Sequence, residues 1–282
     1  MEIAVVGLGL IGGSIAKSIK KNTPHTVLGF DNDPQVMYKA KLLDSIDSAL
    51  TDERLGICDW VIVATWPGAA VDYVTRNADR FKPGAIVMDV CGVKAAVCTP
   101  LWEVAQAHGF TFIGGHPMAG REVSGFDNAS AALFDGASMI LVPPRGADIA
   151  LLERLKKFWC ALGFIGVVVT TPENHDRVIA YTSQLAHVAS SAYIKSPTAL
   201  DHIGFSAGSY KDMTRVAKLD PALWTELFLD NREPLTAEID QLIARLTEYR
   251  DAISANDAER LHALLLAGRE QKLEADRKDY RA

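Results

Sequence analysis

The sequence predicts an α/β protein in two parts, an N-terminal domain built on a mostly parallel sheet and a C-terminal domain made only of helices. Three observations predict this arrangement. Strand-like and helix-like segments alternate in the first half, a glycine-rich turn follows the first strand, and strand-like segments stop at Thr171-Pro172. Alternating strands and helices are typical of βαβ units, in which the strands pair in parallel.

The predicted strands are short apolar runs without polar alternation, which is typical of a sheet covered on both faces. They are Ile3–Val6, Val27–Phe30, Trp60–Ala64, Ala85–Met88, Phe110–Ile113, Ser138–Val142 and Ile165–Thr170. Helix-length stretches separate several of them, namely Ile11–Lys21, Asp33–Leu42 and Ala147–Leu162.

Two long helices are predicted after the last strand. One runs from about His175 to Tyr193 and is apolar almost all round, so we expect it to be buried. The other runs from about Leu235 to Ile253 and carries an apolar stripe at helical spacing. We therefore divide the chain into residues 1–171 and 172–282. Because the helical part is short of partners for its apolar helix, we expect a homodimer through this domain, with a self-sufficient bundle as the alternative.

Composition excludes several classes of protein. With 49% hydrophobic residues among 282, the chain can build a packed core and is not disordered. Its net charge of −6 gives no footprint for a nucleic acid. No basic leader segment and no bilayer-length apolar run is present, so we expect a cytoplasmic protein without membrane contact. The four cysteines form no CxxC pair, which argues against a disulfide scaffold or a metal site.

A glycine-rich turn, Gly7-Leu8-Gly9-Leu10-Ile11-Gly12, lies between the first strand and the first helix. In this context the pattern predicts a Rossmann-type dinucleotide site. Gly7 allows the tight turn, Gly9 lets the backbone approach a pyrophosphate, and Gly12 lets the helix pack on the sheet. The helix N-terminus offers free N–H groups to the phosphates. A glycine turn in a flavodoxin-like domain without a cofactor is the alternative.

Asp31 ends the second predicted strand, 19 residues after Gly12, close to the spacing of about 20 residues at which a carboxylate binds the adenosine ribose. A carboxylate there repels a 2′-phosphate, and no Lys or Arg follows before Lys39. The sequence therefore predicts NAD rather than NADP as the cofactor.

His116 is the candidate proton-transfer residue. It stands in the segment Gly114–Glu122, just after the predicted strand Phe110–Ile113, and Pro117 follows it. Ligands of open α/β sheets bind beyond the carboxyl ends of the strands, so a histidine there is well placed beside a nicotinamide. A purely structural histidine is the alternative.

A polar seam is predicted on the helix that begins near His175. At about 100° per residue, Asp176, Ser183 and His187 point in nearly the same direction. Because buried polar groups need partners, we expect the seam to face a cleft. A hydrogen-bond network inside the helical domain is the alternative.

Three segments resemble the prephenate/arogenate dehydrogenase family of tyrosine biosynthesis. They are the N-terminal GLGLIGGS, the GGHPMAG of Gly114–Gly120 and the KDMTRVA of Lys211–Ala217, and the resemblance covers nearly the whole chain in the same order. It implies NAD-dependent oxidative decarboxylation of prephenate to 4-hydroxyphenylpyruvate. Some members of the family carry a fused chorismate mutase or ACT-type regulatory domain. Because the two expected domains account for all 282 residues, we expect neither of these in this chain.

The resemblance also implies roles for individual residues. His116 accepts the proton of the substrate hydroxyl, Arg215 binds a substrate carboxylate, and His187 lies near the substrate side chain. Glu122 and Asp176 match acidic positions of the family, and we expect both to pair with Arg215 at the mouth of the cleft. Gln184, Lys211 and Trp224 lie in matching segments without an assigned role.

Cys91-Gly92 departs from the family pattern, in which many members carry Gly-Ser there. Gly92 holds the position of the serine, so serine-assisted orientation of His116 is in doubt. We interpret Cys91 as a packing or positioning residue beside the substrate. Thr65, after the predicted strand Trp60–Ala64, is expected to line the ribose side of the nicotinamide.

Three other functions remain open from the sequence. An arogenate dehydrogenase differs only in an amino instead of a keto group on the substrate side chain. A β-hydroxyacid dehydrogenase has the same two-domain plan but uses a catalytic lysine, for which Lys195 and Lys211 are the candidates. A non-catalytic NAD-binding regulatory module is the third.

Overall fold

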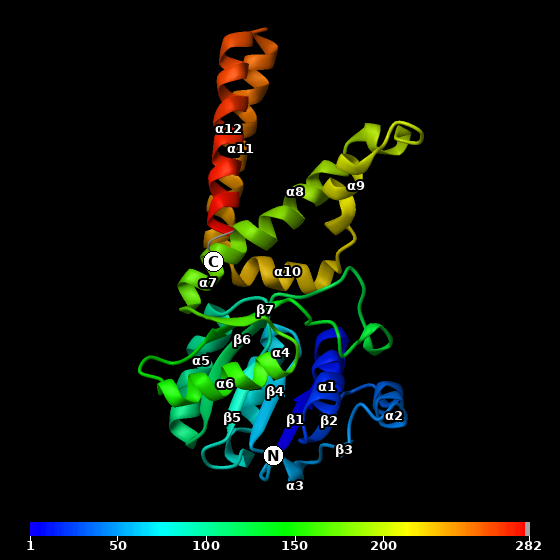
Figure 1. Cartoon of the computed structure of the whole chain (residues 1–282), viewed down its shortest axis with the longest axis vertical. Coiled ribbons are helices and arrows are strands. Elements are labelled where there is room, and N and C mark those ends of the chain that lie inside the picture. The colour runs from blue at the N-terminus through cyan, green and yellow to red at the C-terminus, as the bar shows by residue number, and fades with distance from the viewer. Residues whose placement is uncertain (280–282) are drawn as a thin grey trace. The chain divides into compact units, whose positions relative to one another are not determined.

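The structure is a computed structural model that describes residues 1–279. Within these residues the N-terminal part of the chain forms one eight-stranded sheet with the strand order β3-β2-β1-β4-β5-β6-β7-β8 (Figure 1). All neighbouring strands pair in parallel except β6 and β7. The strands are β1 (Glu2–Val6), β2 (Thr26–Phe30), β3 (Ser48–Ala49), β4 (Trp60–Val63), β5 (Ile86–Asp89), β6 (Thr111–Pro117), β7 (Ser138–Val142) and β8 (Gly166–Val169).

Helices cover both faces of the sheet, as its apolar strands require. They are α1 (Leu10–Asn22), α2 (Pro34–Leu42), α3 (Asp52–Leu55), α4 (Pro67–Arg76), α5 (Ala95–His108) and α6 (Ile149–Ala161). The core on one face contains Ile15 of α1 and Phe158 of α6. The core on the other face contains Val74 of α4 and Leu101 of α5. Each core removes a continuous apolar surface from water, which is the main favourable contribution to folding.

Strand β6 extends past the end of its neighbour β5. Its first half, Thr111–Ile113, pairs in parallel with β5. Its second half, from Gly114 to Pro117, pairs antiparallel with β7 instead. The second half therefore lies beyond the carboxyl end of β5, at the edge where ligands of this fold bind.

The C-terminal part of the chain is helical. Its helices are α7 (Pro172–Ile179), α8 (Leu185–Tyr193), α9 (Gly208–Thr214), α10 (Pro221–Asp230), α11 (Arg232–Ser254) and α12 (Ala258–Asp279). A π-helical segment, Ala180–Gln184, joins α7 to α8, so the two form one continuous helical run. Pro172 at the first turn of α7 and the Thr171 side chain, which accepts a hydrogen bond from Asn174 N–H, fix where this run begins.

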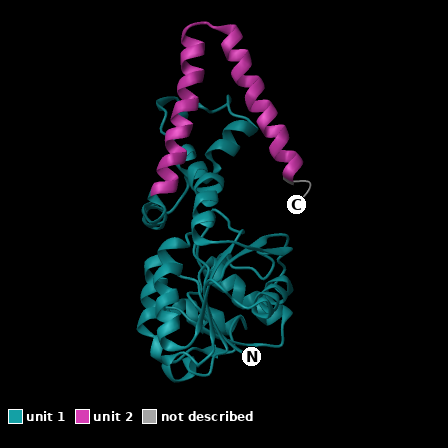
Figure 2. Ribbon diagram, turned by 90° about the vertical axis from the view of Figure 1, so that its left-hand side faces the viewer, with its two compact units in different colours: residues 1–232 teal, residues 233–282 magenta. Residues whose placement is uncertain are grey.

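The chain separates into two compact units, residues 1–232 and 233–282 (Figure 2). The first unit holds the whole sheet together with α7 to α10. The second is a pair of long helices joined by a short turn, with the Tyr249 hydroxyl of α11 donating to the Leu264 carbonyl of α12 at 3.2 Å. The predicted boundary at residue 171 concerns a functional division and stays a prediction.

The predicted fold class is confirmed, with three local differences. The two-residue strand β3 is not predicted, because a pair of residues carries no periodicity. Strand β6 is longer than predicted and includes His116. The run from His175 to Tyr193 is not buried in the chain by itself, since Tyr181 is 63% exposed and Tyr193 is 48% exposed. No helix among residues 1–279 is long and apolar enough to cross a membrane.

Candidate active site

The glycine turn and Asp31 form one hydrogen-bonded unit at the carboxyl edge of the sheet. Gly7 has a φ of +83°, a conformation that favours glycine, and its N–H donates to the Phe30 carbonyl at 2.8 Å. The Asp31 carboxylate accepts hydrogen bonds from Leu8 N–H at 2.8 Å and from Asp33 N–H at 2.9 Å. The end of β2 is thereby fixed beside the turn, in the place predicted for a ribose-binding carboxylate.

The three glycines of the turn have different surroundings. A Cβ at Gly12 would lie 1.8 Å from the Gly7 carbonyl oxygen, and a Cβ at Gly7 would lie 2.5 Å from the Ala64 oxygen. Both positions therefore need glycine for close packing. A Cβ at Gly9 would meet no atom within 4 Å, so the space above Gly9 is open. Gly9 also precedes α1, whose first turn begins at Leu10 and Ile11 with free N–H groups.

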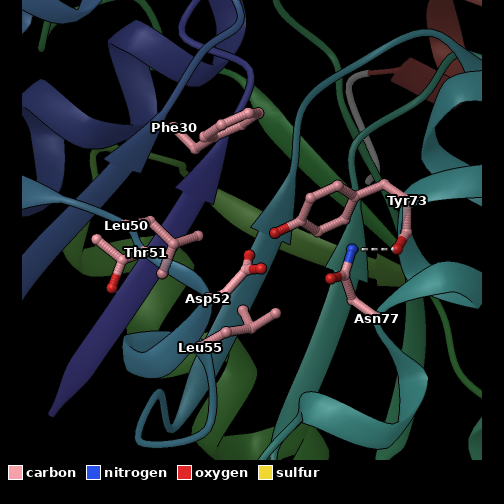
Figure 3. Close-up of a pocket in the computed structure, with 7 residues that line it drawn as sticks. All are labelled: Phe30, Leu50, Thr51, Asp52, Leu55, Tyr73 and Asn77. Atoms are coloured by element: carbon pink, nitrogen blue, oxygen red, sulfur yellow. Dashed lines mark hydrogen bonds between the residues drawn. The ribbon is translucent and has the colours of Figure 1, made fainter.

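A small cavity opens beside this unit, with Leu50 and Tyr73 on opposite sides of it (Figure 3). Its lining residues come from the ends of β2 and β3, from α3 and from α4, and are Phe30, Leu50, Thr51, Asp52, Leu55, Tyr73 and Asn77. Burial raises the pKa of the Tyr73 phenol to about 12. The cavity adjoins Asp31 through Phe30, and its mixed apolar and polar lining suits a flat heteroaromatic group.

His116 lies near the end of β6, paired with Ile140 of β7. The Gly114 and Gly115 before it allow β6 to pack closely, because a Cβ at Gly114 would lie 2.4 Å from Cys98 Sγ and one at Gly115 2.6 Å from the Asp89 oxygen. Burial, together with the positive charges that His175 and Lys94 carry when protonated, lowers the pKa of His116 well below its ordinary value of 6.5. The imidazole is therefore neutral at pH 7, as a proton acceptor must be.

A buried ion pair fixes the loop that follows β5. The Lys94 ammonium donates to Asp89, and both side chains are fully buried. Burial opposes the charge on Lys94, but the carboxylate beside it outweighs this effect and raises the pKa of Lys94. Asp89 also accepts from Cys91 N–H at 2.9 Å and from Gly115 N–H at 3.2 Å. One carboxylate thus ties β5, the Cys91-Gly92 loop and β6 together.

The structure places Gly92 next to His116 and the Cys91 thiol next to Thr65. Cys91 is buried, its thiol contacts the Thr65 carbonyl oxygen at 3.4 Å, and burial raises its thiol pKa well above the ordinary value. A Cβ at Gly92 would lie 4.0 Å from His116 Nε2 and 3.4 Å from Leu227 Cδ2. Gly92 therefore leaves room on the Nε2 side of the imidazole.

His175 is a residue that the sequence analysis missed. Its Nε2 lies 2.9 Å from His116 Nδ1, and its Nδ1 lies 2.6 Å from Asp176 Oδ1. Both residues come from α7 and are almost fully buried. Only the position of His175 one residue before a predicted site residue hinted at this role, and nothing in the sequence indicates contact with β6.

Arg215 and Glu122 form an ion pair between the end of α9 and the loop after β6. This part of the predicted network is confirmed, and the pair is partly exposed to solvent. Asp176 is not part of it. Its carboxylate accepts from the N–H groups of Lys94 and Ala95 at 2.8 Å each, and these bonds hold it inside the protein. The expectation that Asp176 pairs with Arg215 is therefore wrong.

The polar seam is divided by the π-helical segment. His187 Nδ1 lies 2.9 Å from the Ser183 carbonyl oxygen, and its ring stacks on Trp224 of α10 at a centroid distance of 3.7 Å. Asp176 contacts a different set of groups, because the i→i+5 bonds of the π-helix change the helical phase between it and Ser183. Burial lowers the pKa of His187, which keeps this second imidazole neutral as well.

A Rossmann-type sheet with this glycine turn, Asp31 and a partly buried neutral histidine at the carboxyl edge defines a dinucleotide-dependent oxidoreductase. Comparison with known proteins identifies which one. The family model for the nucleotide-binding domain of prephenate dehydrogenase matches residues 15–169, and that for its dimerization domain matches residues 171–267. The chain belongs to the prephenate dehydrogenase family.

Individual relatives agree with this assignment. The chain is 32% identical over 271 residues to the cyclohexadienyl dehydrogenase of Zymomonas mobilis, a match that covers 92% of this chain and 91% of the relative. The prephenate dehydrogenase of Aquifex aeolicus in complex with hydroxyphenyl propionate and NAD+ superposes with a TM-score of 0.86 at 27% identity, covering 98% of each chain. The arogenate dehydrogenase of Synechocystis has a TM-score of 0.81 at 28% identity, covering 99% of this chain and 100% of that one.

Proposed function

We propose that this protein catalyses the NAD-dependent oxidative decarboxylation of prephenate to 4-hydroxyphenylpyruvate, a step of tyrosine biosynthesis. The observation that carries this proposal is a partly buried, neutral His116 at the carboxyl edge of the sheet in a member of this family. The ring carboxylate leaves as carbon dioxide and the ring becomes aromatic. Because aromatisation is downhill, the protein needs to orient the reactants and accept one proton rather than supply a strong electrophile.

The residues around the glycine turn fit NAD. The open space above Gly9 leaves room for a pyrophosphate against the first N–H groups of α1, around Leu10 and Ile11. We assign Asp31 to the adenosine ribose and the cavity of Figure 3 to the adenine. Gly7, Leu8 and Gly12 shape the turn, and we assign Thr65 to the ribose of the nicotinamide. When bound, NAD supplies the acceptor for the hydride that leaves the substrate ring.

His116 is proposed as the general base. It accepts the proton of the ring hydroxyl as the carbonyl forms, and the O–H electron pair becomes part of that carbonyl. The electron pair released when carbon dioxide leaves aromatises the ring and converts the carbonyl to a phenolate, which takes the proton back as the product hydroxyl. A neutral imidazole is required to accept the proton, and burial keeps it neutral. We place the substrate hydroxyl on the Nε2 side of the ring, beside Gly92, where the lack of a side chain leaves room.

Arg215 is proposed to bind a carboxylate of the substrate dianion. Its planar guanidinium can hold a carboxylate in a bidentate arrangement, and it already pairs with the Glu122 carboxylate. Glu122 therefore competes with the substrate and controls access to Arg215. His187, fixed by the Ser183 carbonyl, is proposed to lie beside the substrate side chain. Asp176 and Cys91 are proposed to support the site without contacting the substrate directly, through their contacts with His175, with the N-terminus of α5 and with Thr65.

The helical domain is proposed to form a homodimer. The family model for residues 171–267 is described as a dimerization domain. Exposed apolar side chains on this part of the chain, among them Tyr181, Leu200, Ile203 and Phe205, support this proposal. We retain residues 1–171 and 172–282 as the functional division. A cytoplasmic location is proposed as well, since all four cysteines are unpaired.

Arogenate is the second candidate substrate. It carries an ammonium group where prephenate has a keto oxygen, and Glu122 supplies a partly exposed carboxylate beside Arg215 that could pair with that group. A β-hydroxyacid dehydrogenase is not supported, because Lys195 and Lys211 are both exposed to solvent.

The test is an assay of nicotinamide reduction by the purified protein with prephenate or arogenate, each with NAD or NADP. We expect turnover of prephenate with NAD and a higher KM for NADP. A flat trace with both substrates would favour a regulatory NAD-binding module, and a lower KM for NADP would contradict the role of Asp31.

A further inference from the structure

Two buried side chains of α7, His175 and Asp176, form a hydrogen-bonded chain that ends at the partly buried His116, the proposed base. His116 Nδ1 lies 2.9 Å from His175 Nε2, with the two ring centroids 5.1 Å apart. His175 Nδ1 in turn lies 2.6 Å from Asp176 Oδ1. His175 is 2% exposed and Asp176 3% exposed, so water does not replace any of these contacts. His175 therefore contacts the Nδ1 side of the His116 ring, opposite to the Nε2 of His116.

Asp176 fixes the direction of the hydrogen bonds in this chain. Its two oxygens accept from Lys94 N–H and Ala95 N–H, which are among the free N–H groups at the start of α5. The positive end of the helix dipole at the same place favours a carboxylate as the acceptor. Asp176 therefore accepts from His175 as well, and the hydrogen of His175 sits on Nδ1.

The remaining hydrogens follow from the chemistry of imidazole. We take His175 in its neutral form, in which the imidazole carries one N–H, so a hydrogen on Nδ1 leaves a lone pair on its Nε2. That lone pair can only accept, which places the hydrogen of His116 on Nδ1. His116 Nε2 is then the atom with the free lone pair, and it is the atom of His116 that faces Gly92, 4.0 Å from where a Cβ of that residue would lie.

We propose that His175 is a positioning residue, which with Asp176 holds His116 in the tautomer whose Nε2 is free to accept a proton. The inference rests on the proposed role of His116 as the base. When Nε2 accepts the substrate proton, the N–H on Nδ1 stays bonded to His175, so the ring does not need to turn. His175 thereby links the proton acceptor on β6 to α7.

Other charged and titratable groups surround His116 and His175. Lys94, at the N-terminus of α5, bears a charge that disfavours protonation of His116, and Asp89 of β5 is its partner. Cys91 lies in the loop between them and is a neutral thiol, since burial raises its pKa. None of these groups accepts a hydrogen bond from His116 Nδ1 among the contacts of residues 1–279, so the tautomer depends on His175.

The first test reads the tautomer directly. The full-length protein, labelled with ¹⁵N in its seven histidines, is examined by NMR at pH 7, and the His116 signals are assigned from their loss in His116→Asn. We expect a protonated Nδ1 and an unprotonated Nε2 in the wild type. In His175→Asn, which removes the acceptor, we expect a mixture of the two tautomers. A wild-type His116 protonated on Nε2 would overturn the proposal.

The second test measures turnover. His175→Asn is expected to lower kcat by about 10- to 100-fold while KM for prephenate changes by less than about threefold. His175→Gln, whose side-chain oxygen can reach the position of Nε2 and accept from His116, is expected to recover at least part of the lost kcat. His108→Asn is the matched control, because His108 pairs with Asp79 at 2.7 Å on the exposed end of α5.

Two outcomes separate this inference from the proposed function. If His116→Asn abolishes turnover but His175→Asn keeps kcat within about twofold, the positioning role is wrong and the base stands. If His116→Asn itself remains active, the proposed base is wrong, and the positioning role that rests on it is wrong too. If His175→Asn does not fold, the wild-type tautomer and the kcat of His175→Gln decide the question.

Discussion

The two ends of the proposed substrate site differ in how their side chains are held. Around the partly buried His116, the buried Asp89 and Asp176 carboxylates accept hydrogen bonds from backbone N–H groups of other elements, and the buried His175 contacts His116 itself. Around Arg215 the only ionic partner in the structure of residues 1–279 is Glu122, and both side chains are partly exposed, 62% and 37%. Water competes with an exposed ion pair, so such a pair contributes little to stability and rearranges easily.

The difference indicates that the two ends of the site have different functions. The end that accepts a proton needs its atoms in place before the substrate arrives, since displacement of a base by a fraction of an ångström costs rate. The end that binds a carboxylate needs to exchange one anion for another. We therefore expect substitutions at the buried end to change kcat and substitutions at the exposed end to change KM.

The largest effect is expected for His116→Asn. Loss of the base should lower kcat by about 10²–10⁴-fold, with a modest change in the KM for prephenate. Steady-state kinetics with NAD, beside the surface control His108→Asn, measure this effect. A variant that retains more than a tenth of the wild-type kcat would contradict the role of His116 and remove the contrast between the two ends.

A smaller effect, on a different parameter, is expected for Arg215→Ala. Loss of charge-assisted bonds of about 1.5–3 kcal/mol should raise the KM for prephenate by about 10- to 100-fold, while the KM for NAD stays within about twofold. The KM of Arg215→Lys for prephenate should lie between that of Arg215→Ala and that of the wild type, since an ammonium keeps the charge but loses the bidentate geometry.

Arg245→Ala is the control for this substitution. Arg245 pairs with Glu248 at 3.1 Å, and the two side chains are exposed to nearly the same extent as Arg215 and Glu122. We expect no change in either KM. Equal increases in the KM for prephenate and for NAD in Arg215→Ala would show that the arginine has no specific role toward the substrate.

The pH dependence should reflect the burial of His116. Its lowered pKa keeps the base neutral down to pH values below about 6.5, so kcat/KM should stay constant from neutral pH to there and decrease only further into the acid range. A profile of kcat/KM against pH measures this. An acid limb with its midpoint above 6.5 would show that burial does not control the titration.

The free energy of unfolding should also decrease in the acid range. Between the lowered pKa of folded His116 and the ordinary value near 6.5, the unfolded chain binds a proton that the folded chain does not. The contribution of His116 to the free energy of unfolding is therefore fully present above about pH 6.5 and decreases as the pH falls below it. Urea titrations of the wild type and His116→Asn should show a weaker acid destabilisation in the variant.

The smallest effect is expected for Gly92→Ser. The added Cβ would lie at ordinary contact distance, 3.4 Å from Leu227 and 4.0 Å from His116 Nε2. We therefore expect the serine of the family pattern to fit, with kcat within about threefold of the wild type. Gly92→Val is the comparison, since its extra methyl groups have no such space and should lower kcat. If Gly92→Ser loses as much activity as Gly92→Val, catalysis requires that no side chain occupies the space beside His116 Nε2.

The sequence predicted the parts of the site that depend on local pattern. The glycine turn, Asp31 and His116 each follow a predicted strand, and the carboxyl edge of a parallel sheet gathers such residues from distant parts of the chain. The pairing of Glu122 with Arg215 was expected from the family resemblance and was confirmed. His175 and Lys94 were missed, because their importance depends on contacts across 59 and 5 residues of sequence that no spacing rule describes.

The error at Asp176 has a definite physical cause. An ideal helix of about 3.6 residues per turn would put Asp176, Ser183 and His187 on one face. The π-helical segment Ala180–Gln184 breaks that phase, and it is held by tertiary bonds, with Gln184 donating to the Leu227 carbonyl at 3.1 Å and accepting from Asn231 at 2.6 Å. No local sequence pattern predicts such a π-helical segment.

The sequence by itself determined the fold class, the dinucleotide site and the residue proposed as the base, because helix, strand and turn preferences act over a few residues. Only the tertiary structure decided which side chains meet His116, how it is kept neutral, and that Asp176 turns inward while Glu122 meets Arg215. These outcomes depend on burial and on hydrogen bonds between elements far apart in the chain, and both exist only after the elements have packed.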